Sequence, residues 1–365
     1  MKRAIVAVIL CFALVGCWDQ LELKNLHFVD TIGIDYEGGG KQLKVGYVIT
    51  ALREANQGGG KPSSVYVEST GDNLYEAAAR SNKAMPGILS VLETRLYLIG
   101  TRFAKDRPMQ YLNMASQFIT NPFYAYLAMY DGDVAKLLAT KGFKGKTVSD
   151  FLIGLLEDEK ERGRIPPNKL LNYILGGNGY VNDFALNRFE SYEEGVRLAG
   201  TALFRDGTYT GVNLNDEDTQ LAYLLREGAG ANQLLVGQWN GKAYSVLLQH
   251  AARRYRIRTN SQGIEEIRVS LKLDVKLIED GVKDRKYAAG DYAELETAIE
   301  RDLTSKSEGV IKTLQRANCD YLQLGGKAAA YHPEATKRMN WRALYPVVRI
   351  KPEVRATILN SGILE

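Results

Sequence analysis

The chain has 365 residues, of which 45% are hydrophobic and 25% are charged. These proportions are ordinary for globular proteins and argue against a largely disordered chain. The length is enough for two or three domains. The 47 basic and 43 acidic residues give a formal net charge of +4, so the charge balance gives no reason to expect nucleic acid as a partner.

The N-terminus has the pattern of a bacterial secretory signal. Lys2 and Arg3 precede an apolar run that extends from Ala4 to Val15. A permanent membrane-spanning helix needs about 20 apolar residues, and this run ends sooner. An ordinary signal peptide closes with an A-x-A-like site of small residues, whereas here the closing residues are "LVGC" at 14–17.

This ending resembles a lipobox, in which a small residue precedes a cysteine that receives a diacylglyceryl group. We therefore predict that residues 1–16 are a lipoprotein signal peptide, that cleavage falls between Gly16 and Cys17, and that Cys17 is the lipidation site. Two acyl chains hold a protein on a bilayer because each buried methylene contributes about 0.8 kcal/mol. The alternatives are a soluble secreted protein and an uncleaved anchor in which Cys17 is only a small apolar residue.

Cysteine usage follows from this prediction. Cys11 would leave with the signal and Cys17 would carry lipid, so Cys319 alone remains and no intrachain disulfide can form. We expect Cys319, at the end of a long helical pattern, to be a packed small hydrophobe. Without Lys2 and Arg3, 45 basic residues face 43 acidic ones, for a net charge of +2.

The first half of the chain predicts strands that alternate with helices. The run "HFVDTIGIDY" (27–36) and the alternating residues 43–50 predict a hairpin, and a glycine-rich break follows at 56–62. From Val65 to about Thr140, strand and helix patterns alternate, which favours a mainly parallel sheet. Thr147 and Asp150 have the spacing of a helix-starting capping box.

A second hairpin is predicted to turn at Asp206 and Gly207, and a helix to start near Asn215 with acidic residues in its first turn. Because two strands alone are marginally stable, we expect this unit to complete the N-terminal hairpin. The predicted domains are a split N-terminal domain of residues 17–57 plus 195–231 and a middle α/β domain of residues 60–190.

The C-terminal part has the clearest pattern. Apolar residues occupy every odd position from Ile267 to Leu277, as in a strand with one wet face. A long helix is predicted from about Asp291 to Arg316, and a last strand near the C-terminus. We expect residues 232–365 to form an α+β domain with an antiparallel sheet and a long helix. The predicted fold class is thus α+β or mixed α/β, with three domains whose mixed and antiparallel sheets are packed by helices.

The sequence offers no catalytic constellation. Its three histidines, His27, His250 and His332, are not spaced to lie on one helix face, so we predict no metal site, no cofactor and no Cys/His nucleophile. The run Gly145, Lys146, Thr147 resembles the end of a phosphate loop, but its required first glycine is replaced by Thr140.

A basic cluster could touch anionic lipid headgroups on an anchored protein. It comprises Arg253, Arg254, Arg256 and Arg258. Tyr255 and Ile257 alternate with the last arginines at strand spacing, which favours the simpler interpretation of a solvated strand face.

Four sets of residues form a recognisable series along the chain: "GCWDQLEL" from Gly16, "IGID" at 32–35, "GTALF" at 200–204, and the C-terminal residues Trp341, Tyr345, Pro346, Ile358 and Gly362. In this order they resemble the Ger(x)C family of spore germination lipoproteins. The segment "CDYLQLGG" departs from the family pattern, because it keeps Asp320, Gly325 and Gly326 but lacks the expected proline.

The resemblance implies a three-domain lipoprotein, the C subunit of a GerA-type nutrient germinant receptor. Such a subunit lies on the outer face of the inner spore membrane, is held in the bilayer through acylated Cys17, and works with two integral membrane subunits, A and B. The family has no known enzymatic activity, and no site residue beyond Cys17 is carried over. The alternative is a solute-binding lipoprotein that delivers a nutrient to a membrane transporter.

Overall fold

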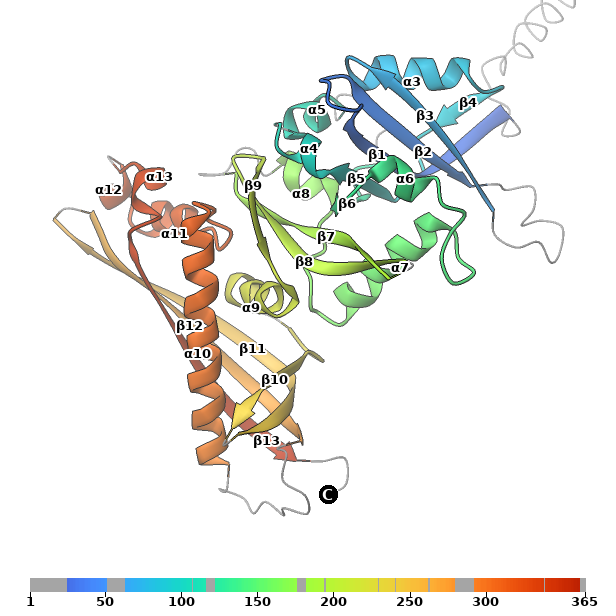
Figure 1. Cartoon of the computed structure of the whole chain (residues 1–365). Coiled ribbons are helices and arrows are strands. Elements are labelled where there is room, and N and C mark those ends of the chain that lie inside the picture. The colour runs from blue at the N-terminus through green and yellow to red at the C-terminus, as the bar shows by residue number, and fades with distance from the viewer. Residues whose placement is uncertain are drawn as a thin grey trace, which may run out of the picture.

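The structure, a computed structural model, describes residues 25–50, 63–106, 108–115, 122–175, 182–193, 195–228, 230–239, 241–261, 263–279, 292–337 and 339–361. Two sheets make up its framework, with the helix α9 (Asp216–Glu227) between them (Figure 1). The predicted fold class is confirmed, because mixed and antiparallel strands are packed by helices.

The larger sheet has the strand order β3-β2-β1-β5-β6-β7-β8-β9, with β4 also paired to β1. The strands β1, β5, β6 and β7 run parallel to one another, and the two ends of the sheet are antiparallel hairpins. Its strands are β1 (Leu26–Tyr36), β2 (Leu43–Thr50), β3 (Ser64–Gly71), β4 (Ile88–Ser90), β5 (Leu96–Gly100), β6 (Tyr126–Asp131), β7 (Phe184–Tyr192), β8 (Gly195–Arg205) and β9 (Thr208–Leu214).

Helices cover both faces of the parallel part, as a parallel sheet requires. One face buries side chains of α3 (Leu74–Lys83), α4 (Thr101–Ala104), α5 (Pro108–Ala115) and α8 (Leu170–Leu175). The other face buries side chains of α6 (Val134–Leu138) and α7 (Val148–Glu161). The predicted cap of α7 is confirmed: the Thr147 hydroxyl accepts from the Asp150 amide at 3.1 Å.

We expected the hairpin of β8 and β9 to pack on the N-terminal hairpin of β1 and β2, but the structure separates the two. β5, β6 and β7 lie between the N-terminal hairpin and the β8/β9 hairpin. The physical reason is that every residue of β5 is buried, so this strand needs neighbours on both edges, and it takes the free edge of β1. Both hairpins therefore complete the same sheet from opposite ends. The division into three domains stays a prediction.

The smaller sheet has the order β10-β11-β12-β13. Its strands are β10 (Leu234–Trp239), β11 (Lys242–Asn260), β12 (Gly263–Glu279) and β13 (Arg349–Ser361). The alternation predicted for 267–277 is confirmed, because the odd positions are buried in β12. The sheet differs from the antiparallel one we expected at its last strand: β13 runs parallel to β12, because α10 (Ala293–Arg316) carries the chain back along the sheet before β13 begins.

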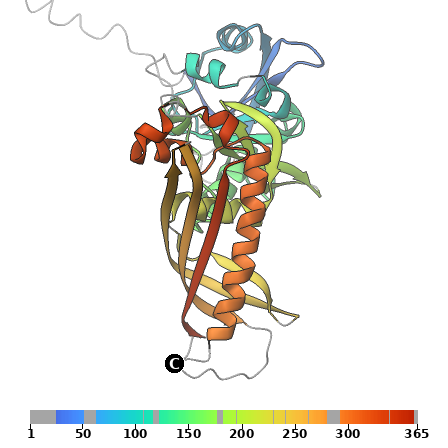
Figure 2. The same cartoon turned by 90° about the vertical axis from the view of Figure 1, so that its left-hand side faces the viewer.

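Helix α10 lies along β13 for much of its length (Figure 2). Its acidic side chains accept hydrogen bonds from the outer edge of that strand: the Ala356 amide donates to Glu300 at 3.1 Å and the Ile358 amide to Glu296 at 2.7 Å. A free strand edge would otherwise leave these amides without partners. The helix thus closes the edge of the sheet as well as covering one face.

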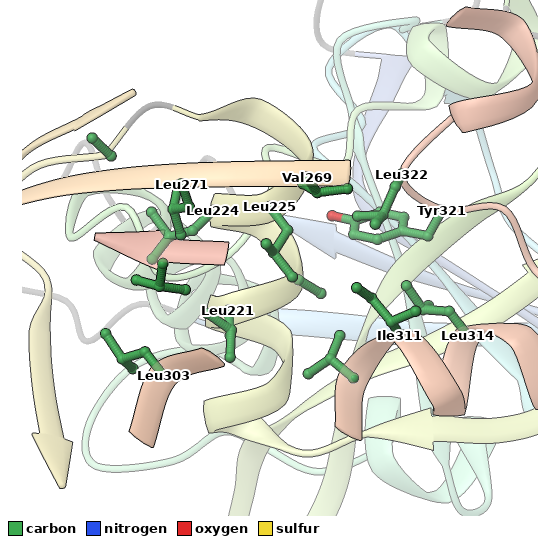
Figure 3. Close-up of a cluster of buried hydrophobic side chains, with 14 of the residues drawn as sticks. Leu221, Leu224, Leu225, Val269, Leu271, Leu303, Ile311, Leu314, Tyr321 and Leu322 are labelled. Carbon is green, nitrogen blue, oxygen red and sulfur yellow. The ribbon is translucent and has the colours of Figure 1, made fainter. Parts of the chain in front are cut away.

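Helix α9 connects the cores of the two sheets. Its Leu221, Leu224 and Leu225 lie among side chains of β12 and α10 (Figure 3). The same cluster includes Ala185, Leu203 and Leu214 of the larger sheet. Full burial of one leucine contributes about 1.5–3 kcal/mol, so this continuous core fixes the smaller sheet to the larger one. Three short helices lie between α10 and β13 in the sequence: α11 (Leu324–Tyr331), α12 (Pro333–Thr336) and α13 (Trp341–Leu344).

Candidate functional site

The predicted lipidation site lies outside the described residues. Gly16 and Cys17 precede Asn25, the first residue that the structure places, and so do the remaining residues of "GCWDQLEL". The predicted modification of Cys17 therefore stays a prediction. Two polar arrangements in the described chain contain other residues that we had singled out, and each is a candidate for function.

The first arrangement is a cleft of about 410 Å³ at the carboxyl ends of β1, β5 and β6. Ligands of open α/β sheets bind at such strand ends. The segment "IGID" supplies two of its residues. Gly33 makes room for α6, because a Cβ there would lie 2.4 Å from Leu138 Cδ1. The polar lining includes Asp35, Glu37, Lys44, Tyr66, Arg102 and Asp133.

Asp35 is the most buried carboxylate of this cleft, with a side chain that is 16% exposed. It accepts hydrogen bonds from the amides of Tyr36 at 2.8 Å and Phe103 at 3.3 Å. Burial raises its pKa, opposed by those two amides and by Arg102, whose Nε lies 3.9 Å away. The cleft presents charges of both signs and could hold a small polar molecule.

The second arrangement lies where the two sheets meet, around Asp183. The Asp183 side chain is fully buried and forms a two-point ion pair with Arg342, with both nitrogen–oxygen distances at 2.5 Å. Asp206, in the β8/β9 turn, also pairs with Arg342. This two-point geometry joins the end of the larger sheet to α13, 159 residues away in sequence.

Asp320 is buried beside this pair. Its carboxylate accepts the Leu324 amide at 2.8 Å, the Gly325 amide at 2.7 Å and the Trp341 indole N–H at 2.9 Å. Gly325 is required by the close approach of the Trp341 ring, because a Cβ there would lie 2.5 Å from Nε1. Burial outweighs the donated hydrogen bonds and raises the pKa of Asp320 to about 7.

The hydrogen bonds to Asp320 stabilise the turn in "CDYLQLGG", where the expected proline is absent. Gln323 adopts a left-handed backbone with φ at 56°, directly before α11. The two amides at the start of α11 are bound by Asp320, which acts as the helix cap from outside the helix. Asp320 and Gly325 of "CDYLQLGG" therefore both take part in the turn, which forms here without the proline.

Two segments that were compared with the family pattern, "GTALF" and "CDYLQLGG", lie in contact beside Asp183 and Asp320. Phe204, the last residue of "GTALF", stacks on Phe184 with ring centroids 4.9 Å apart. The Cys319 thiol donates to the Phe204 carbonyl at 3.2 Å. Cys319 is fully buried, as we predicted, and burial raises its pKa. Because the nucleophile is the thiolate, this thiol is suited to packing rather than to catalysis.

Sequence reasoning identified Asp320, Trp341 and Tyr345 only as isolated marks and missed Asp183 and Arg342. Nothing in the sequence relates residues 183 and 342, because their contact depends on the placement of the two sheets. The one available signal was an aspartate directly before the apolar run that begins β7. Within the described ranges, no group of three His, Cys, Asp or Glu side chains could hold a metal ion.

The comparisons with known proteins cover almost the whole chain. Residues 19–188 match the family model for the spore germination protein N-terminal domain, and residues 199–362 match the model for the spore germination B3/GerAC-like C-terminal domain. The chain is 23% identical to spore germination protein GerQC of Bacillus cereus, over 100% of both chains. It is 22% identical to spore germination protein B3 of Bacillus subtilis, over 96% of this chain and 95% of that protein.

A solved structure shares the fold. The crystal structure of the GerBC protein matches with a TM-score of 0.60 at 15% identity, covering 90% of this chain and 97% of that one. The two domain matches, one N-terminal and one C-terminal, define the class of this chain as a spore germination protein. The chain belongs to the Ger(x)C family. No helix in the part of the chain that the structure describes is long and apolar enough to cross a membrane.

Proposed function

We propose that this chain is the lipid-anchored C subunit of a spore nutrient germinant receptor. It is held through acylated Cys17 on the outer face of the inner spore membrane and acts through contacts with the integral membrane A and B subunits, without catalysis. The observation that carries the proposal is the placement of Cys17, the predicted lipidation site, two residues before the first of two family matches, which cover residues 19–188 and 199–362.

A tether explains how such a subunit works without an active site. Confinement to one membrane raises its effective concentration near its partners without any new contact. The continuous core through α9 and the Asp183–Arg342 ion pair give the subunit a fixed shape. A rigid accessory subunit needs such a shape if it is to present a defined surface to its partners.

Replacing Cys17 by alanine should abolish lipidation. We expect the variant to lose all incorporation of an alkyne analogue of palmitate, because the thiol that accepts the acyl-bearing group is absent. Incorporation can be measured on the spore membrane preparation. Cys11→Ala is the matched control, since that residue lies in the predicted signal peptide and its variant should keep full labelling. Continued labelling of the Cys17→Ala chain would refute the assignment.

The cleft beside Asp35 supports a second candidate function, the binding of a small solute. It has charges of both signs at the carboxyl ends of parallel strands, where such ligands bind. Calorimetric titration of the chain with amino acids and sugars tests it. Saturable binding that Asp35→Ala removes would favour a solute-binding lipoprotein, and absence of heat with every nutrient would exclude it.

A further inference from the structure

One face of the smaller sheet is strongly basic. α9 and α10 pack on the opposite face, where the odd residues of β12 are buried. The cross-strand register places three basic residues from each of β11, β12 and β13 side by side on the open face. We call this surface the basic face. Its basic residues are Arg254, Arg256 and Arg258 of β11, Arg268, Lys272 and Lys276 of β12, and Arg349, Lys351 and Arg355 of β13.

Strand geometry sets the size of this surface. Neighbouring strands lie about 4.8 Å apart and each residue advances about 3.3 Å. From Arg268 to Lys276 the basic face is therefore roughly 27 Å long, and three strands make it about 10 Å wide. It is an open, extended surface and not a pocket, which suits an extended partner better than a small molecule.

Acidic residues neutralise only part of the basic face. Four carboxylates of the sheet belong to it: Glu265, Glu266, Asp274 and Glu353. A fifth, Glu300 of α10, pairs with Arg355 at 2.9 Å. Glu266 alone is shared among four cations, the closest being Lys351 at 3.1 Å and Arg268 at 3.4 Å. The described residues provide no carboxylate within 4.0 Å of Arg254 or Arg256. Nine basic side chains thus face five carboxylates, on a chain whose mature net charge is only +2.

We propose that the basic face docks on an anionic bilayer surface and so fixes the orientation of the anchored chain. Each basic residue near such a surface contributes about 1 kcal/mol within a Debye length. The row of Arg268, Lys272 and Lys276 ends at Ile278, an apolar residue that is 48% exposed. Basic residues beside an exposed apolar side chain are typical of surfaces that lie on headgroups.

This inference uses the proposed Cys17 anchor, which keeps a bilayer within reach of the chain. The anchor turns a weak charge attraction into an intramolecular contact, since the effective concentration of the membrane is high for a tethered protein. Arg254, Arg256 and Arg258 are exposed on one side of β11, as their strand spacing predicted. The structure adds the two neighbouring strands, which turn one row of charges into a surface.

The test reconstitutes the full lipidated chain in vesicles of phosphatidylcholine, with or without phosphatidylglycerol. A fluorophore on Ser270→Cys reports the basic face, and one on Ser305→Cys reports the exposed side of α10. A headgroup nitroxide lipid quenches whichever probe lies at the bilayer. We expect at least threefold stronger quenching of the Ser270 probe than of the Ser305 probe when phosphatidylglycerol is present. Raising salt from 0.1 M to 1 M shortens the Debye length from about 10 Å to about 3 Å and should remove the difference.

The combined variant Arg254→Glu, Arg256→Glu, Lys272→Glu should abolish the quenching. Its side chains are solvent-exposed, so circular dichroism should stay unchanged. Equal quenching of both probes, or quenching that ignores phosphatidylglycerol, would overturn the proposal. Capture of an acidic protein segment by this face without any effect of anionic lipid would also overturn it. Retention of the chain on vesicles at 1 M salt reports the anchor separately, so failure of the anchor and failure of the basic face give different results.

Discussion

Replacing Arg342 by alanine should lower the free energy of unfolding by about 3 kcal/mol. The change leaves the Asp183 carboxylate buried without its ion-pair partner, and removal of one member of a buried pair costs about 3–5 kcal/mol. We expect the lower end of this range because the amides of Asp206 and Asp320 still donate to Asp183, at 3.0 Å and 2.6 Å. Denaturant unfolding followed by circular dichroism measures the effect.

Arg355→Ala is the matched control for this experiment. Arg355 also forms an ion pair with a carboxylate, at 2.9 Å from Glu300, but its side chain is 78% exposed. An exposed pair contributes about 0.2–1 kcal/mol, so this variant should differ from the parent chain by less than about 1 kcal/mol. Equal losses of unfolding free energy in the two variants would mean that burial of the Asp183 side chain does not set the contribution of its ion pair to stability.

Replacing Asp320 by alanine should cost a similar amount near pH 5. The change orphans three donors, the amides of Leu324 and Gly325 and the indole N–H of Trp341. Each buried group left without a partner costs about 1–3 kcal/mol. The expected loss is about 3–5 kcal/mol at this pH, since the carboxyl is then largely protonated and no buried charge is removed.

The pH dependence gives the second half of this prediction. The folded pKa of Asp320 is raised to about 7, above the ordinary value of about 3.9 for an unfolded aspartate. The unfolded chain therefore releases this proton at lower pH, so the contribution of Asp320 is complete below about pH 4 and is lost as pH rises to about 7. Asp320→Asn cannot titrate and should have a flatter profile of unfolding free energy between pH 4 and 8. Identical slopes for the parent chain and Asp320→Asn would contradict the raised pKa.

The sequence predicted those elements whose residues alternate or recur along the chain. The period-two pattern from Ile267 to Leu277 located β12, and the apolar stripe of α10 located that helix to within two residues. Asp206 and Gly207, both with positive φ, form the hairpin turn that their residue types predicted. These signals are local, so a single sequence contains them.

The remaining features depend on contacts between distant segments. The order of strands in the larger sheet follows from which edge of β1 is free, and the parallel direction of β13 follows from the crossover through α10. The ion pair of Asp183 and Arg342 likewise arises only when two sheets meet. Family marks such as Asp320 and Trp341 were visible in the sequence, but their contact was not.

The most direct test of the proposed function is purification of the tagged full chain from detergent-solubilised membranes of dormant spores, followed by mass spectrometry. The account predicts an acylated Cys17 at the amino end and two integral membrane proteins of the A and B types recovered with it. A chain recovered alone, with an unmodified amino end and in the soluble fraction, would contradict the account.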